Sequence, residues 1–185
     1  MGVEAADWRS DLQSVLLTEE SIKARVDELG RQLASDYNGQ HPLVVGVLKG
    51  SVIFLSDLVR AMGIPLQIDL VCVTSYGQSA KSCGSITLLK DLSAEAKGRH
   101  VLLVEDIIDS GVTVSQLADL LDQREPASLK VCSLLSKPAR REVACEPDYL
   151  GFEIPDEFVV GYGLDYAERY RWLPYVAVLK PEAYA

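Results

Sequence analysis

Cysteine and histidine are scarce in this sequence, whose 185 residues include 4 cysteines and 2 histidines. No two cysteines have the C-x-x-C spacing that is typical of zinc sites and redox-active dithiols. Three of the four lie in or beside apolar runs, as reduced core thiols do. The four are Cys72, Cys83, Cys132 and Cys145. We therefore expect reduced thiols and a cytoplasmic protein.

Long apolar runs are also absent, although 48% of the residues are hydrophobic. No run is long enough to span a bilayer, and the first 16 residues are acidic and lack a basic, apolar signal segment. There is no internal repeat, low-complexity tract or linker rich in proline and glycine. The composition predicts a single domain over residues 1–185, with no membrane partner.

Positively charged residues are outnumbered: the sequence has 18 lysines and arginines and 27 aspartates and glutamates, which gives a net charge of -9. Such a surface disfavours nonspecific binding of nucleic acid, and we expect no nucleic-acid partner. A ligand that carries phosphate would have to be bound locally, with the help of a metal ion.

Strand and helix patterns alternate along the chain. Apolar residues recur at helical spacing over residues 22–37, after a "TEES" segment in which Thr18 or Ser21 can cap the helix. A buried strand is predicted over 42–47, "LKGS" is a turn, and a helix follows over 52–62. The predicted buried face of that second helix consists of Val52, Leu55, Val59 and Met62.

The same unit recurs further on. Strands are predicted over 66–76, 84–90, 100–105 and 128–135, and a helix over 112–123. This alternation is typical of a parallel α/β sheet. Ligands of such sheets bind beyond the carboxyl ends of the strands, where "LKGS", "EDIIDSGVT" and "SKPAR" all fall.

The stretch "VLLVEDIIDSGVT" (101–113) ends an apolar strand in three carboxylates and a glycine turn. Backbone amides of Ser110, Gly111, Val112 and Thr113 at a helix N-terminus suit a phosphate dianion. Carboxylates only accept hydrogen bonds, so Glu105 and Asp106 suit the vicinal hydroxyls of a ribose. The spacing matches neither G-x-x-x-x-G-K-[ST] nor G-x-G-x-x-G. By itself the stretch fits an acidic N-cap cluster equally well.

The whole string resembles the phosphoribosyl-pyrophosphate loop of the type I phosphoribosyltransferases. The segments "VVGVLKGS", "TSYG", "SLLSKPAR" and "GFEIPDEFVVGYGLDYAERYR" are similar to the hypoxanthine-guanine branch of that family, in the same order. The resemblance extends from about residue 15 to about residue 182.

This resemblance implies the type I phosphoribosyltransferase fold, in which a twisted parallel sheet flanked by helices carries a small hood over the active site. The core would span roughly 38–150, and the hood the N-terminal segment and roughly 151–185. The implied reaction converts hypoxanthine and guanine with 5-phosphoribosyl-1-pyrophosphate into IMP and GMP and releases pyrophosphate. A homodimer or homotetramer is implied as well, with "LKGS" and the following helix as our candidate for part of the contact.

The resemblance also assigns roles to residues of the phosphoribosyl loop and the purine pocket. Asp109 matches the general base, Glu105 and Asp106 match the ribose ligands, and the segment 109–113 matches the cradle of the 5-phosphate. Purine contacts are implied for Lys137, Phe158, Val159 and Asp165.

Further implied roles concern the leaving group, the metal and a lid. Lys49 and Gly50 match the pyrophosphate loop, in which a cis peptide precedes the lysine, and Arg171 matches a pyrophosphate ligand. The Mg²⁺ ligands are expected among Glu105, Asp106 and Asp165. Ser75 and Tyr76 match a lid that excludes water from the reacting centre.

Two other classes of protein share parts of this pattern. A phosphorylation-receiver domain also has an acidic pair after a strand and a Lys-Pro pair, but more elements separate them there than the one helix and one strand found here. A regulator with the phosphoribosyltransferase fold would bind the donor as an effector without catalysis, and the sequence leaves this alternative open.

Overall fold

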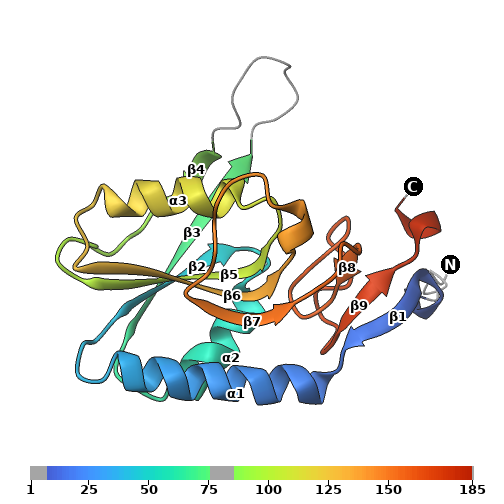
Figure 1. Cartoon of the computed structure of the whole chain (residues 1–185), viewed down its shortest axis with the longest axis horizontal. Helices are drawn as coiled ribbons and strands as arrows, with labels where there is room; N and C mark the ends of the chain where they lie inside the picture. Colours follow the sequence, from blue (N-terminus) through green and yellow to red (C-terminus); the bar gives the residue numbers. More distant parts are fainter. Residues whose placement is uncertain (1–7, 76–85, 185) are drawn as a thin grey trace, which may run out of the picture.

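Two β-sheets organise the chain in the computed structural model, which describes residues 8–75 and 86–184 (Figure 1). The large sheet has six strands in the order β4-β3-β2-β5-β6-β7. They are β2 (Leu43–Leu48), β3 (Gln67–Ser75), β4 (Ile86–Lys90), β5 (His100–Ile108), β6 (Ser128–Ser136) and β7 (Tyr149–Glu153). The pairs β3-β2, β2-β5, β5-β6 and β6-β7 are all parallel, as the alternating pattern predicted.

The edge strand β4 is the exception, because it pairs antiparallel with β3. The sequence analysis predicted a parallel sheet and was wrong for this strand. Only residues 76–85 separate β3 from β4. A parallel return usually needs a crossover of a dozen or more residues, whereas an antiparallel one needs only a short connection.

Three helices cover the two faces of the large sheet (Figure 1). They are α1 (Glu19–Asp36), α2 (Val52–Met62) and α3 (Val112–Asp122). Helices α1 and α2 pack on one face with Val44 and Leu102, while α3 packs on the other with Val45 and Leu103. Adjacent strand residues point to opposite faces, so the continuous apolar run of β5 serves both layers.

Both α1 and α2 begin and end close to the predicted bounds. The Thr18 side chain caps α1 and accepts a hydrogen bond from the Ser21 amide at 3.2 Å. The predicted buried face of α2 was partly wrong: Val52 is 43% exposed, and the helix buries Phe54, Leu55, Leu58 and Met62. Apolar residues occur nearly all round α2, so its periodicity alone does not select the buried face.

A small antiparallel sheet lies at one end of the large sheet (Figure 1). It combines β1 (Leu12–Leu17) with β8 (Val159–Val160) and β9 (Val176–Leu179), in the order β1-β9-β8. Short 3-10 turns occupy Trp8–Asp11, Pro138–Arg140 and Pro181–Ala183. The division into a core and a hood stays a prediction.

Three cysteines lie in the described part of the chain, and all three are free thiols. Cys132 is buried, and burial raises the pKa of its thiol. Cys72 and Cys145 are half-buried, and Cys83 lies outside the described residues. Within residues 8–75 and 86–184, no helix has the length and apolar character needed to cross a membrane.

Candidate active site

The predicted site residues gather where three neighbouring parallel strands end. Strand β2 ends at Leu48, β5 at Ile108 and β6 at Ser136. These strands are adjacent in the order β2-β5-β6, so the loops that follow them leave the same edge of the sheet. The loops carry Lys49, Asp109 and Lys137, which are far apart in the sequence.

Two carboxylates form the floor of this site, Glu105, which is buried, and Asp106, which is partly buried. Glu105 is only 9% exposed, and its Oε2 atom is buried without a hydrogen-bond partner. Burial raises the pKa of Glu105 well above its usual value, and the neighbouring Asp106 adds to the rise. Burial also raises the pKa of Asp106 to about 6, although the Ile107 amide and the Arg171 guanidinium both favour its ionised form. Neither carboxylate forms an ion pair with another described residue.

The loop after β2 lies directly on this floor. The peptide bond between Leu48 and Lys49 is cis, as the family resemblance implied. A side chain at Gly50 would overlap the carboxylate of Asp106, and one at Gly163 would overlap the Gly50 carbonyl oxygen. Glycine therefore lets three segments meet at van der Waals distance, and this brings the backbone at Gly50 against the carboxylate of Asp106.

Two cations, Arg171 and Lys49, and their carboxylate partners form what we call the rim of the site. The Arg171 Nη2 atom lies 2.7 Å from Asp165 Oδ1 and 3.4 Å from Glu168 Oε2. The Lys49 Nζ atom lies 2.9 Å from Glu168 Oε1. Because Arg171 lowers and Asp165 raises the pKa of Asp106, the rim and the floor are electrostatically coupled. Glu168 thus bridges the two cations that were predicted to bind pyrophosphate.

The predicted phosphate cradle runs from the end of β5 into α3. Gly111 occupies the N-cap position of α3 with a positive φ of 84°, a conformation that suits glycine. The Asp109 carboxylate does not cap the helix. Its Oδ1 atom lies 2.9 Å from Arg140 Nε instead. The Ser110 hydroxyl accepts a hydrogen bond from the Val112 amide at 3.3 Å.

Arg141, in the segment that follows β6, hydrogen-bonds to the backbone of the cradle. Arg141 donates from Nη1 to the Ile108 carbonyl at 2.9 Å and to the Asp109 carbonyl at 2.5 Å. Its Nη2 atom donates to the Ser136 hydroxyl at 2.6 Å. One guanidinium therefore ties the ends of β5 and β6 together under the loop.

A cavity of about 460 Å³ opens beside the cradle and contains most of the predicted purine residues. Asp109, Lys137, Phe158 and Val159 line it, together with Ile107, Arg140, Asp156, Glu157, Leu164 and Tyr184. Lys137 is 7% exposed and Phe158 is 37% exposed. Asp165, also predicted to contact the purine, lies at Arg171 instead.

Sequence reasoning assigned no role to Arg140, Glu168 or Tyr184. Arg140 and Glu168 both lie inside quoted motifs, so they carried a signal that we did not use. Tyr184 lies outside every motif, and only the fold brings it to the cavity. Of the two predicted lid residues, Ser75 ends β3 opposite Ile86, and Tyr76 lies outside the described residues.

The donor set fits a hard cation that is shared with a ligand. The described residues contain no group of three or more His, Cys, Asp or Glu side chains that would hold a metal ion alone. Glu105 nevertheless has a buried oxygen without a hydrogen-bond partner, and neither Glu105 nor Asp106 forms an ion pair with a described residue. Mg²⁺ typically takes one or two carboxylates and completes its shell with water and substrate phosphate. The pair therefore fits a magnesium ion that arrives with its substrate.

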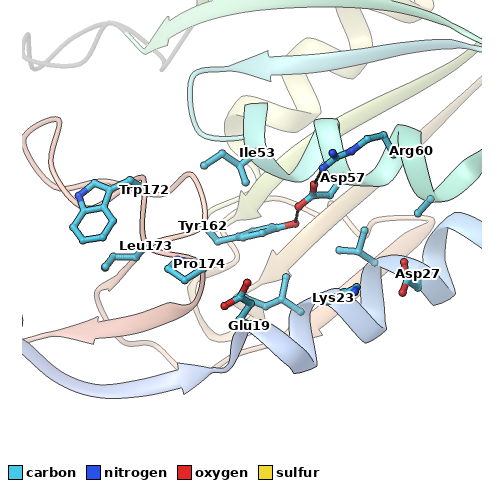
Figure 2. Close-up of a pocket in the computed structure, with 13 residues that line it drawn as sticks. Glu19, Lys23, Asp27, Ile53, Asp57, Arg60, Tyr162, Trp172, Leu173 and Pro174 are labelled. Atoms are coloured by element: carbon cyan, nitrogen blue, oxygen red, sulfur yellow. Dashed lines mark hydrogen bonds and ion pairs between the residues drawn. The ribbon is translucent and has the colours of Figure 1, made fainter.

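A larger cavity, of about 530 Å³, lies between α1, α2 and the segment 162–174 (Figure 2). On one wall the Tyr162 hydroxyl donates to Asp57 Oδ2 at 2.6 Å, and Arg60 pairs with the same carboxylate. Charged residues of both signs, including Glu19 and Lys23, occupy the α1 side. None of its described lining residues is a predicted site residue.

Comparisons with known proteins identify the family of this chain. The phosphoribosyl transferase domain model matches residues 13–167. The hypoxanthine-guanine phosphoribosyltransferase of Bacillus subtilis is 48% identical over 176 residues, which cover 95% of this chain and 98% of that protein. A crystal structure of a hypoxanthine phosphoribosyltransferase from Staphylococcus aureus superposes with a TM-score of 0.93 at 45% identity, covering 99% of this chain and 100% of that one.

One group of relatives is much longer. The bifunctional protein TilS/HprT of Listeria innocua is 52% identical over 176 residues, or 95% of this chain. The chain spans only 27% of the length of that protein.

Proposed function

The chain belongs to the phosphoribosyltransferase family, and on that basis we propose that it is a purine salvage enzyme. It converts hypoxanthine and guanine with 5-phosphoribosyl-1-pyrophosphate into IMP and GMP and releases pyrophosphate. The observation that carries this proposal is the acidic pair Glu105 and Asp106. These carboxylates form no ion pair with a described residue, precede an amide-rich turn, and lie close enough to Arg171 for it to lower the pKa of Asp106.

The ribose phosphate of the donor binds at the end of β5. Amides of residues 110–113 and the hydroxyls of Ser110 and Thr113 hold the 5-phosphate at the start of α3. Glu105 and Asp106 accept hydrogen bonds from the two ribose hydroxyls, which replace water around carboxylates that burial has desolvated. The Arg141 contacts to the Ile108 and Asp109 carbonyls keep this loop in place before the donor arrives.

The pyrophosphate of the donor binds between the floor and the rim. Lys49 and Arg171 contact its oxygens, and Glu168 gives up its contacts with both cations when the anion enters. When bound, Mg²⁺ supplies a positive charge that neutralises the leaving pyrophosphate, with Glu105, Asp106 and Asp165 as its candidate ligands. Charge neutralisation at this point favours cleavage of the anomeric bond, which develops cationic character at the sugar.

The purine binds in the cavity beside the cradle. Phe158 stacks on the base, the Val159 backbone reads its edge, and the buried Lys137 ammonium donates to the 6-oxo group. Adenine presents a 6-amino donor to the same lysine and is therefore rejected. Asp109 holds the proton of one imidazole nitrogen while the other attacks the sugar, which requires the purine to displace or bypass the Arg140 ion pair.

The assembly is a homodimer or homotetramer in the cytoplasm, with part of the contact formed by Leu48–Ser51 and α2. Val52 on α2 is 43% exposed and Trp172, beside the larger cavity, is 62% exposed, which supports an apolar contact there. Sedimentation equilibrium tests this proposal, and a monomer at every concentration would contradict it.

The function is tested by measuring nucleotide formation from the donor and Mg²⁺ with hypoxanthine, guanine, xanthine, adenine or uracil, in separate reactions. We expect product with the 6-oxopurines only, and its loss when a chelator is added. Donor binding by calorimetry without product from any base would favour the regulator that binds the donor as an effector.

Asp109→Asn tests the role of the general base. This variant keeps the size of the side chain, so donor affinity should remain within about two-fold while turnover falls by about 10²–10⁴-fold. An equal loss of donor affinity would instead assign Asp109 a structural role in the cradle.

A further inference from the structure

Phe158 belongs to an aromatic cluster in the small-sheet region. The Tyr184 ring stacks on the Phe158 ring, with centroids 4.6 Å apart and planes inclined by 19°. The Tyr166 ring meets Phe158 edge-on, at 5.7 Å and 88°. Tyr166 and Tyr184 also contact each other at 6.4 Å. Phe158 is thus held on one face and at its edge by two tyrosines.

This pair of tyrosines is anchored in a separate apolar cluster. Both pack against the buried residues Val160, Tyr170, Leu173 and Leu179. The backbone joins the same parts, because the Leu179 amide donates to the Phe158 carbonyl at 2.8 Å. The ring of Tyr184 is therefore fixed from the small-sheet side.

The stacking distance decides where a base can lie. A planar base between two rings needs about twice the spacing of a single stacked pair, and 4.6 Å leaves no room for it. Phe158 is still 37% exposed and lines the cavity with Lys137 and Asp109. Tyr184 lines the same cavity, so a base that stacks on Phe158 would use the ring face that Tyr184 leaves uncovered.

We propose that Tyr184 is a positioning residue for the purine: by stacking on one face of Phe158, it holds that ring ready to stack on the base with its other face. An exposed phenylalanine beside a short strand otherwise loses side-chain freedom when the base binds, which weakens binding. Tyr184 removes that freedom before the base arrives. The inference rests on the proposed function, because it takes the ligand of Phe158 to be a purine.

The matched variants are Tyr184→Ala, Tyr184→Leu and Tyr184→Phe, with Trp8→Ala as control. Leucine keeps apolar volume without the ring, and phenylalanine keeps the ring without the hydroxyl. Trp8 packs on the same cluster, but its aromatic partner is Trp172, at 4.9 Å between centroids. The control thus removes an aromatic side chain of this region that does not stack on Phe158.

The measurement is calorimetric binding of two ligands, GMP, which carries the base, and ribose 5-phosphate, which lacks it. Loss of one aromatic pair corresponds to a weakening of about three- to ten-fold. We expect this increase in the Kd of GMP for Tyr184→Ala and Tyr184→Leu, with the Kd of ribose 5-phosphate within about two-fold of wild type. Tyr184→Phe and Trp8→Ala should leave both within about two-fold.

Steady-state kinetics should agree, with a higher KM for the base and an unchanged KM for the donor in the alanine and leucine variants. An equal increase in the Kd of both ligands would show that the variant disrupts the structure of the small-sheet region as a whole. Tighter GMP binding would show that Tyr184 occupies the place of the base. Either result overturns the inference while leaving the proposed function intact. A wild-type protein that binds ribose 5-phosphate but not GMP would instead overturn the proposed function, and the inference with it.

Discussion

The floor and the rim of the candidate site each contain two carboxylates, in opposite electrostatic settings. On the floor, Glu105 is buried and Asp106 is partly buried, and both have raised pKa values and form no ion pair with a described residue. On the rim, Asp165 and Glu168 pair with Arg171, and Glu168 also pairs with Lys49. Lys49 and Arg171 lower the pKa of Glu168, with the Lys49 hydrogen bond as the largest cause.

This difference indicates what each side of the site is built to receive. Buried carboxylates without a partner destabilise the folded state unless a ligand supplies hydrogen-bond donors or a cation. Cations that are already paired with an exposed carboxylate can exchange it for another anion at little cost. The floor therefore suits hydroxyls and magnesium, and the rim suits pyrophosphate.

Gly50→Ala should have the largest effect, because its side chain would force the rim loop away from the floor. A displacement of about 1 Å at a reacting centre typically lowers the rate about 100-fold, and we expect a loss of that size in kcat/KM. Steady-state kinetics measures it. Gly39→Ala is the control: Gly39, unlike Gly50, has a positive φ, but a side chain there would meet no neighbouring atom within 4 Å. Near-wild-type kcat/KM for Gly50→Ala would contradict the close contact.

Asp106→Asn should separate binding from stability. The variant loses a charged acceptor and should weaken donor binding about 10- to 50-fold by calorimetry. At pH 8 the ligand-free protein should gain about 1–3 kcal/mol in free energy of unfolding, because no buried charge remains. Asp69→Asn is the opposite case, since backbone amides and Lys90 lower the pKa of Asp69, and this variant should be destabilised. A destabilised Asp106→Asn would refute the contrast.

The pH dependence of that gain sharpens the comparison. The pKa of Asp106 rises from 3.8 to about 6 on folding, so between these values the folded state binds more protons than the unfolded state. Stability from this group is fully present below pH 3.8 and is lost as the pH rises through 6. The difference in unfolding free energy between Asp106→Asn and wild type should therefore be near zero at pH 4 and largest at pH 8. Denaturant titrations at several pH values test this, and a constant difference would contradict it.

Glu168→Gln should have the smallest effect, and it should strengthen ligand binding, whereas the preceding variants weaken binding or activity. Without this carboxylate, Lys49 and Arg171 no longer exchange an internal anion for pyrophosphate, so pyrophosphate should bind about two- to five-fold more tightly. Calorimetry with magnesium pyrophosphate provides the measurement. Glu28→Gln, which removes the exposed partner of Arg25 on α1, should change nothing. Weaker binding to Glu168→Gln would mean that this carboxylate supports the site.

Sequence patterns predicted most of the elements because local periodicity reports burial directly. The run of β5 and the spacing of Ile22, Val26, Leu29 and Leu33 on α1 both correspond to buried faces. The patterns failed for the direction of β4 and for the buried face of α2. Direction depends on how the chain returns, and the buried face of a nearly uniformly apolar helix depends on what packs against it.

For the site, the motifs located Glu105, Asp106, Asp109 and Lys137 at one edge of the sheet, although their roles stay predictions. The contacts that these residues and their neighbours make in the fold could not be predicted from the sequence. Lys49 and Glu168 are 119 positions apart. Nothing in the local sequence around either residue encodes that they meet.

By itself, the sequence determined the alternation of strands and helices, the family resemblance and the acidic strand end that meets a glycine turn, because these features are local. Only the tertiary structure decided that Glu105 and Asp106 form no ion pair with a described residue while Arg171 lies close enough to lower the pKa of Asp106. It also decided that Tyr184 stacks on Phe158. Charge compensation and ring stacking depend on distances of a few ångströms, and folding alone sets these between residues far apart in the chain.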